Sequence, residues 1–201
     1  MICIARITSV IALASIAVAA NAELLFTGVD TGRFNANAFT VSSNDTQTLS
    51  GLTFRGSTFS EMTSNFFVAF GGAPANPNVN NFGSFALANT AANYTGNTFT
   101  LRMTFTSPSG VNGDFFADVV GSVSSVGGGG VLINFGAPQQ FNYNEGTFLV
   151  TLNDVAINPG LTASITGTIQ ATPVPEPASM AAIGLGVVGL LARRRRARRL
   201  S

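Results

Sequence analysis

The longest part of the chain, residues 23 to 172, alternates apolar and polar side chains with a period of two. The clearest run is Thr98 to Thr106, in which Phe99, Leu101, Met103 and Phe105 alternate with threonines and one arginine. Successive side chains of a strand point to opposite faces of its sheet. This run therefore predicts a core strand with one buried face and one wet face.

Most of the remaining body also predicts strands. Alternation predicts strands in the segments 52–55, 148–153 and 161–169, and apolar runs predict strands at 24–29, 66–70, 82–87, 115–126 and 131–135. Almost no stretch has the 3.6-residue period of a helix. Several short strands at this spacing favour an all-β fold, which we predict to be a single antiparallel β-sandwich of the jelly-roll type.

Turn residues separate these strands. The four glycines from Gly127 to Gly130 predict a hairpin connection, since glycine accepts positive φ at little cost. Further turns are predicted at Gly71-Gly72-Ala73-Pro74, Asn112-Gly113-Asp114, Asn144-Glu145-Gly146 and Asn158-Pro159-Gly160. The segment from Gly71 to Asn81, crowded with Asn and Pro, predicts a surface loop. Seventeen phenylalanines supply bulk for the core.

An uncharged apolar run covers residues 178–192 and is followed by an arginine-rich segment. As a helix, fifteen residues at roughly 1.5 Å each span about 22 Å, less than the roughly 30 Å hydrocarbon core of a bilayer. We predict a short transmembrane helix, whose length is small for a permanent anchor. The positive-inside bias places the tail 193–201 in the cytoplasm; its arginines are Arg193, Arg194, Arg195, Arg196, Arg198 and Arg199.

Two other interpretations of this region stay open. An arginine run can bind nucleic acid or act as an import signal. The apolar run can also be the last helix of a soluble core. The Ala182-x-x-x-Gly186 spacing of a helix-pairing face is attributed to chance in a segment this rich in Ala and Gly.

Residues 1–22 have the three parts of a secretory signal peptide. Arg6 supplies positive charge, Ile7 to Ala19 is apolar, and Ala20 and Ala22 stand at the positions that signal peptidase needs, so the mature chain is expected to start at Glu23. An uncleaved anchor is the alternative. The single cysteine, Cys3, leaves with this segment, so the mature protein is predicted to contain no disulfide.

The residues between the body and the apolar run have a distinctive order. Val174, Pro175, Glu176, Pro177, Ala178 and Ser179 precede a short span rich in Gly, Ala and Leu, which terminal arginines follow. Residues 173–201 resemble the PEP-CTERM sorting signal of exported bacterial proteins. The resemblance implies an exosortase as processing enzyme, which cuts near the Pro-Glu-Pro and releases or transfers the protein. It also implies a Gram-negative source that makes extracellular polysaccharide, floc or biofilm.

Charge is sparse in the body of the chain. Residues 23–172 contain three arginines, eight carboxylates and no lysine or histidine, a net charge of −5. An acidic body disfavours nucleic acid and anionic lipid as partners. The expected partners are signal peptidase and the export machinery, the exosortase, the inner membrane in passing, and extracellular polysaccharide.

The residue types present argue against catalysis. Without His, Lys or a mature Cys, the usual general base, amine and thiolate nucleophiles and imidazole metal ligand are missing. Carboxylate pairs of a glycosidase could be nominated at Asp114 with Asp118 or at Glu145 with Asp154, but we interpret these as solvated turn residues. Calcium bound by Asn112, Asp114 and Asp118 is a further hypothesis. No cofactor and no metal are expected.

Three function classes follow. We predict a non-enzymatic cell-surface or matrix protein with a structural or adhesive role, held at the inner membrane with a periplasmic ectodomain before it reaches the surface or is secreted. The main alternative is a lectin-like carbohydrate-binding module. It is weakened by the absence of Trp and by the presence of only Tyr94 and Tyr143 beside phenylalanines assigned to the core. A hydrolase that relies on carboxylates alone is the third class.

Overall fold

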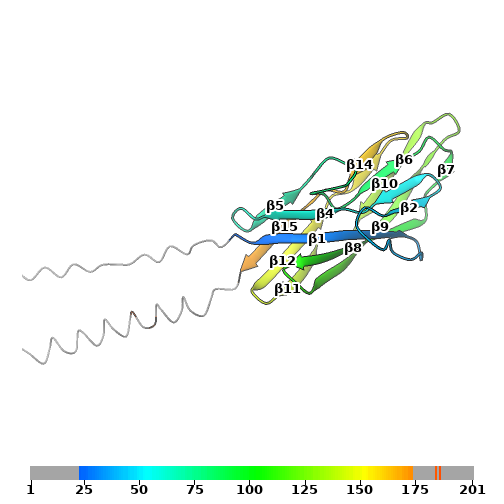
Figure 1. Ribbon diagram of the computed structural model, residues 1–201. Helices are drawn as coiled ribbons and strands as arrows, with labels where there is room; N and C mark the ends of the chain where they lie inside the picture. Colours follow the sequence, from blue (N-terminus) through cyan, green and yellow to red (C-terminus); the bar gives the residue numbers. More distant parts are fainter. Residues whose placement is uncertain (1–22, 174–183, 185, 187–201) are drawn as a thin grey trace, which may run out of the picture.

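The computed structural model describes residues 23–173, 184 and 186. Within residues 23–173 all named elements are β-strands, and the named strands pair antiparallel in three sheets (Figure 1). The predicted all-β antiparallel fold is therefore confirmed, whereas its finer description as a jelly-roll sandwich stays a prediction. The predicted helix at 178–192 lies outside the described residues except for Gly184 and Gly186.

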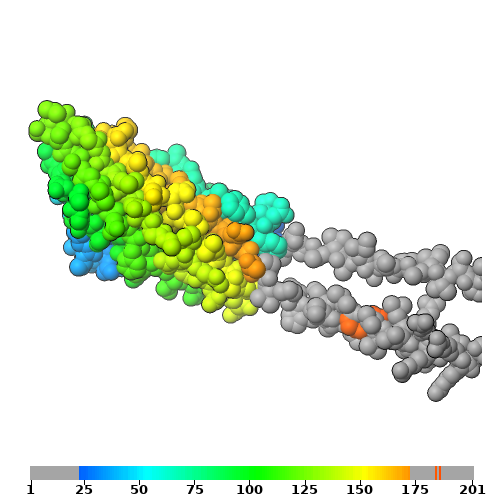
Figure 2. All heavy atoms as spheres, turned by 180° about the vertical axis from the view of Figure 1, so that it is seen from behind, coloured from blue at the N-terminus to red at the C-terminus, as the bar shows by residue number. Residues whose placement is uncertain are grey.

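The large sheet has seven strands in the order β13-β10-β9-β8-β1-β4, with the short β7 paired to β9. Its strands are β1 (Leu25–Phe34), β4 (Thr58–Met62), β7 (Ala92–Asn93), β8 (Asn97–Ser107), β9 (Val111–Val123), β10 (Gly129–Phe135) and β13 (Val155–Ile157). β8 lies in the middle, and its four alternating apolar side chains are buried, as the sequence predicts. Figure 2 shows the elongated domain from behind.

Two sheets of four strands complete the domain. The second sheet has the order β11-β12-β15-β5, and the third has the order β14-β6-β3-β2. The second sheet contains β5 (Phe67–Phe70), β11 (Gln139–Tyr143), β12 (Gly146–Leu152) and β15 (Gly167–Pro173). The third sheet contains β2 (Thr46–Leu49), β3 (Leu52–Arg55), β6 (Ser84–Leu87) and β14 (Thr162–Ser164).

A layer of phenylalanine rings joins the large sheet to the two smaller ones. Phe99 of β8 lies 4.9 Å, centroid to centroid, from both Phe54 and Phe85 of the third sheet. Phe26 and Phe105 each lie 5.0 Å from Phe148 of the second sheet. Tilted and edge-to-face pairs of this kind add to the free energy gained by burying the rings. The rings form two groups, one around Phe99 and one around Phe105, and aliphatic side chains such as Leu101 and Met103 join them in a single buried core.

β1 is longer than the predicted strand at 24–29. Its inward positions after Phe26 are Gly28, Asp30 and Gly32, which interrupt the apolar phase. A Cβ atom at Gly28 would lie 2.4 Å from the Phe59 ring, and one at Gly32 would lie 2.6 Å from the Phe54 ring. Rings from other strands fill the space above these glycines. The strand continues because its partners supply the missing bulk.

Asp30 is fully buried between these two glycines. Neither carboxylate oxygen has a hydrogen-bond partner, although the backbone N–H of Asp30 donates to the carbonyl of Ser57 at 2.9 Å. Burial removes water from the carboxyl group and raises its pKa well above its usual value. The protonated form is the one that this position favours.

The sequence predicts a surface loop from Gly71 to Asn81. The structure corrects this in part, because Asn78 and Asn81 are fully buried. The Asn78 amide nitrogen donates to the hydroxyl of Ser84 at 2.7 Å and to the carbonyl of Gly56 at 3.3 Å. Its backbone N–H donates to the side-chain oxygen of Asn44. Buried amides need such partners, so Asn78 ties this connection to three other segments.

The turn predicted at Asn112-Gly113-Asp114 is wrong. These residues lie inside β9, paired with β8, and the chain turns earlier, between Ser107 and Val111. A Cβ atom at Gly113 would lie 2.4 Å from the Phe141 ring. Gly113 therefore makes room for an aromatic side chain of the second sheet and does not mark a turn.

The single strand predicted at 161–169 is two strands in different sheets. β14 pairs with β6 in the third sheet, whereas β15 pairs with β12 and β5 in the second. Ile165 connects them: its backbone N–H donates to the carbonyl of Gly83 at 2.8 Å, and its carbonyl accepts from Phe82 at 2.9 Å. The alternation continues through the crossing because Ile165 stays buried.

The first and the last strand meet at one end of the elongated domain. β1 begins and β15 ends there (Figure 1). The turn between β11 and β12 lies at the same end, since Gly146 pairs with Pro173 and residues 143–145 share a hollow with residues 23–26. The predicted turns at Gly127 to Gly130 and at 144–146 both connect antiparallel neighbours, as expected.

Candidate functional site

The outward face of the large sheet carries a groove that crosses β1, β8, β9 and β10. Its volume is about 640 Å³. The side chains that give it its chemistry are Arg33, Asn35, Thr98, Phe116, Asp118 and Asn134. One exposed aromatic ring is thus surrounded by hydrogen-bond donors and acceptors.

Phe116 is the aromatic residue of this groove. Its neighbour Phe115 is 3% exposed, whereas Phe116 is 63% exposed. The two-residue period of β9 forces this result, because Phe115 shares the inward phase with Ala117 and Val119. Phe116 therefore presents most of its ring to solvent on the outward face of the sheet.

The groove contains opposite charges. Arg33 forms no ion pair within residues 23–173, and its Nε atom has no hydrogen-bond partner there. The Arg33 guanidinium lies 4.5 Å from the centroid of the Phe39 ring. Asp118, on β9, is exposed. The groove can therefore both donate hydrogen bonds and accept them.

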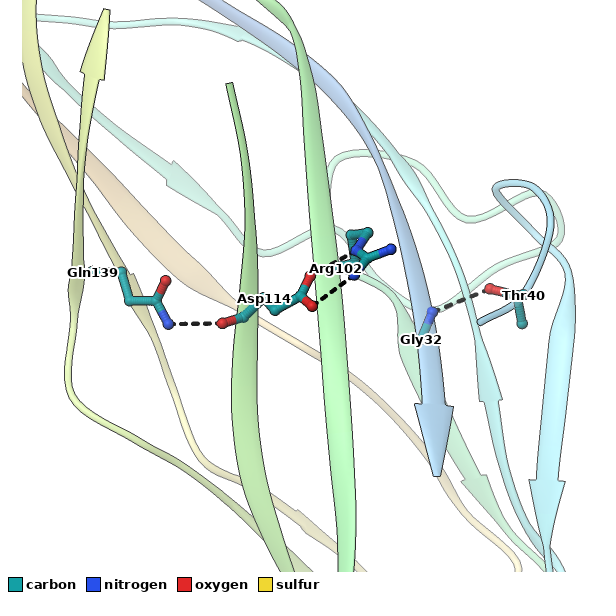
Figure 3. Close-up of polar contacts among 5 residues, drawn as sticks. All are labelled: Gly32, Thr40, Arg102, Asp114 and Gln139. Atoms are coloured by element: carbon teal, nitrogen blue, oxygen red, sulfur yellow. Dashed lines mark hydrogen bonds and ion pairs between the residues drawn. The ribbon is translucent and has the colours of Figure 1, made fainter. Parts of the chain in front are cut away.

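A cluster of polar contacts lies next to the groove on the same face of the sheet (Figure 3). Arg102 of β8 donates from Nε and Nη2 to both Asp114 oxygens at 2.7 Å, and these bonds raise the pKa of the guanidinium. The same guanidinium lies 3.9 Å from the Phe39 centroid. The loop that carries Phe39 is fixed to β1, since Gly32 N–H donates to Thr40 Oγ1 at 3.1 Å.

We expect this ion pair to contribute little to stability. The side chains of Arg102 and Asp114 are 43% and 27% exposed, and ion pairs this accessible contribute roughly 0–1 kcal/mol. In a double-mutant cycle of Arg102→Gln and Asp114→Asn, urea unfolding should therefore give a coupling free energy below about 1 kcal/mol. A coupling above about 2 kcal/mol would mean that the pair is held in a drier environment than its exposure indicates.

The structure does not bring either nominated carboxylate pair together. Asp114 and Asp118 are four residues apart on β9, a separation of about 13 Å at roughly 3.3 Å per residue. Glu145 and Asp154 flank opposite ends of the seven-residue β12, more than about 20 Å apart. Paired glycosidase carboxyls lie about 5–9.5 Å apart. Asp114 and Asp118 are also strand residues and not the turn residues that the sequence suggested.

The calcium hypothesis gains no support from these positions. Asn112, Asp114 and Asp118 point outward from one strand, and Asp114 is already bound by Arg102. Asp154 accepts a hydrogen bond from the Phe135 N–H at 2.9 Å. Within the described part of the chain, no group of three or more Asp, Glu, His or Cys side chains is placed to hold a metal ion.

Sequence reasoning missed the residues of the groove. Phe116 was included in an apolar run at 115–126, and Arg33, Asn35 and Asn134 were not singled out. One signal for Phe116 was available: when two phenylalanines are adjacent in a strand, only one can face the core. The polar residues gave no such signal, because they converge only when four strands are placed side by side.

The other candidate site is the segment that follows β15. The family model described as PEP-CTERM protein-sorting motif matches residues 173–196. The chain carries a PEP-CTERM sorting motif. This match confirms the resemblance seen in the sequence, and it makes the protein an exported one whose processing partner is an exosortase. No match was found among curated proteins or among solved structures.

Most residues of the predicted sorting and export sites lie outside the described part of the chain. This applies to the motif residues 174–179, to Ala20 and Ala22, and to the arginines of 193–199; Glu23 is described and exposed. Among residues 23–173, 184 and 186 no helix is long and apolar enough to cross a bilayer. The short span at 178–192 lies almost entirely outside these residues and stays a prediction.

Proposed function

We propose that this protein is a structural or adhesive component of the cell surface or of the exopolysaccharide matrix. In this proposal the short span holds it in the inner membrane, with residues 23–172 in the periplasm, until exosortase acts and the domain reaches the surface. The PEP-CTERM motif at residues 173–196, directly after the last strand, is the observation that carries the proposal.

The shape of the domain supports this role. We propose that its three sheets form a two-layer β-sandwich, with the large sheet against the other two, because aromatic pairs join it to both. Such a domain is stabilised by burial without disulfides or bound groups. The proposal includes no catalytic step, since residues 23–172 lack His, Cys and Lys and neither nominated carboxylate pair is within reach.

Replacing Pro175, Glu176 and Pro177 by alanine tests the sorting step. We expect the variant to keep its C-terminal segment and to stay in the membrane fraction, because the enzyme no longer recognises its substrate. Intact mass of the protein from membrane and medium fractions measures this in the native cell. A matched control changes three polar residues of the domain surface, Thr104, Thr106 and Asn112, to alanine.

The control should be cut and released like the wild type. If the motif variant is truncated and released at wild-type levels, exosortase recognition at this motif is wrong. A second outcome separates the two parts of the proposal. If the motif variant is retained in the membrane, but the released wild type is found only as free protein in the medium, the sorting step stands and the surface or matrix role is wrong.

A further inference from the structure

We propose that the groove on the outward face of the large sheet binds a neutral polysaccharide, with Phe116 as the ring on which a sugar face stacks. This inference rests on the proposed adhesive function and names the partner of the domain. It starts from the 63% exposure of Phe116, which leaves a broad apolar surface beside polar side chains.

The polar side chains of the groove fit hydroxyl groups. A sugar hydroxyl both donates and accepts hydrogen bonds, as serine and threonine hydroxyls do. Asp118 can only accept and Arg33 can only donate. The Asn35 amide, which already bonds Asn97 and the Thr98 N–H, and the Asn134 amide, which faces the Asp154 carboxylate, keep capacity to do both. A ligand whose groups are all of one kind would leave part of this set without partners, and unpartnered polar groups weaken binding.

Charge favours a neutral glycan over an acidic one. Arg33 offers one positive charge to the groove and Asp118 one negative charge, so the lining has little net charge. The surrounding domain carries a net −5 over residues 23–172, which repels polyanions at low ionic strength. A polymer of uronic acids would find no net positive charge in the groove and would be repelled by the acidic domain.

Size and position also suit a polymer ligand. The volume of about 640 Å³ falls in the range of roughly 300–1,000 Å³ that is usual for small-molecule sites. The groove includes Arg33 and Asn35 at the end of β1 and Thr98 at the start of β8. It therefore lies toward the opposite end of the large sheet from the point where β15 leads into the sorting motif, and an anchored domain keeps it accessible.

Native affinity electrophoresis of the mature protein from its own cell tests the proposal. The probes are dextran, hydroxyethyl cellulose and galactomannan as neutral polymers, with alginate and polygalacturonate as acidic ones. We expect at least one neutral polymer to retard the wild type. Phe116→Ala should weaken this binding about tenfold, equivalent to about 1.4 kcal/mol, and Asp118→Asn and Arg33→Gln should each weaken it.

The matched control is Leu149→Ala, which removes an apolar side chain that is 37% exposed on β12, in the second sheet; it should bind like the wild type. Retardation by acidic polymers only, by none of the five, or equally for Phe116→Ala and the wild type would overturn the proposal. Thermal unfolding shows that each variant is folded. A failure here leaves the sorting result intact, because that result is read from mass and location.

Discussion

Replacing Phe99 by alanine is expected to lower the free energy of unfolding by about 3–5 kcal/mol, the usual cost of removing a buried phenylalanine. Phe99 is fully buried and contacts the rings of Phe34, Phe54 and Phe85 from three other strands. Its removal leaves a cavity where the large sheet meets the third sheet. Because whole domains are stable by about 5–15 kcal/mol, this loss should be visible in urea unfolding at room temperature.

Phe116→Ala is the control for this experiment. It removes the same side chain from a position that is 63% exposed, so its effect should stay within about 0.5 kcal/mol. The two variants differ only in which face of the large sheet loses a ring. Equal losses at both positions would contradict the assignment of the aromatic layer as the core.

Replacing Asp30 by asparagine is expected to stabilise the protein at neutral pH. The Asp30 carboxyl is fully buried without a hydrogen-bond partner, and burial raises its pKa. Asparagine has nearly the same shape and cannot ionise. The asparagine amide is left as unpartnered as the acid, so the gain comes only from removing the free energy of keeping Asp30 uncharged in the folded state, about 1.4 kcal/mol for each unit by which the pKa is raised. We therefore expect a gain of about 1–3 kcal/mol at pH 7 in urea unfolding.

The pH dependence of this gain follows from the upward shift of the Asp30 pKa in the folded state. Below the usual Asp pKa of about 3.9 both the folded and the unfolded chain hold the proton, so Asp30 carries no ionisation cost. As pH rises from there through the raised pKa of the folded state, the unfolded chain loses its proton first, and stability falls. The advantage of Asp30→Asn should therefore be small near pH 3.5 and grow toward pH 7.

Asp118→Asn is the matched control, since Asp118 is exposed on β9. It should change stability by no more than about 0.5 kcal/mol. A stability of Asp30→Asn that stays below the wild type from pH 4 to pH 7 would show that the asparagine amide meets a worse environment than the acid. If the free energy of unfolding of Asp30→Asn and of the wild type changed in parallel with pH, Asp30 would not titrate on unfolding.

Strands with regular alternation could be predicted from the sequence, and strands completed by distant residues could not. β8 could be predicted from the alternation of Phe99, Leu101, Met103 and Phe105 with polar residues. The strand predicted at 24–29 stops short of Phe34, because Asp30 and Gly32 interrupt the apolar phase. In the structure the Phe54 ring of β3 fills the space above Gly32. The sequence pattern of one segment does not show which aromatic side chain of another strand will pack against it.

Polar residues caused the other errors. Asn78 looked like a loop residue, but its amide satisfies three backbone and side-chain groups in the interior. Short strands such as β4 and β13, with few buried side chains, gave too weak a pattern to be recognised. Asparagine-rich segments are usually exposed, so only the tertiary contacts reveal this exception.

The two candidate sites differ in how far sequence reasoning reaches. The sorting motif is contiguous, so its order and spacing over residues 173–196 were sufficient to identify it. The groove is assembled from β1, β8, β9 and β10. Its residues run from Arg33 to Gly136, 103 positions apart in the chain, and the strand order that unites them cannot be read from any one segment.

The place of β15 within its sheet determines how the domain responds to mechanical force. A pull transmitted from residue 174 enters at Pro173, and β15 has β12 on one side and β5 on the other. Traction along the strand axis loads both ladders in shear, so their hydrogen bonds must rupture together and cannot peel one by one. We therefore expect a domain held through this strand to resist unfolding under flow or tension.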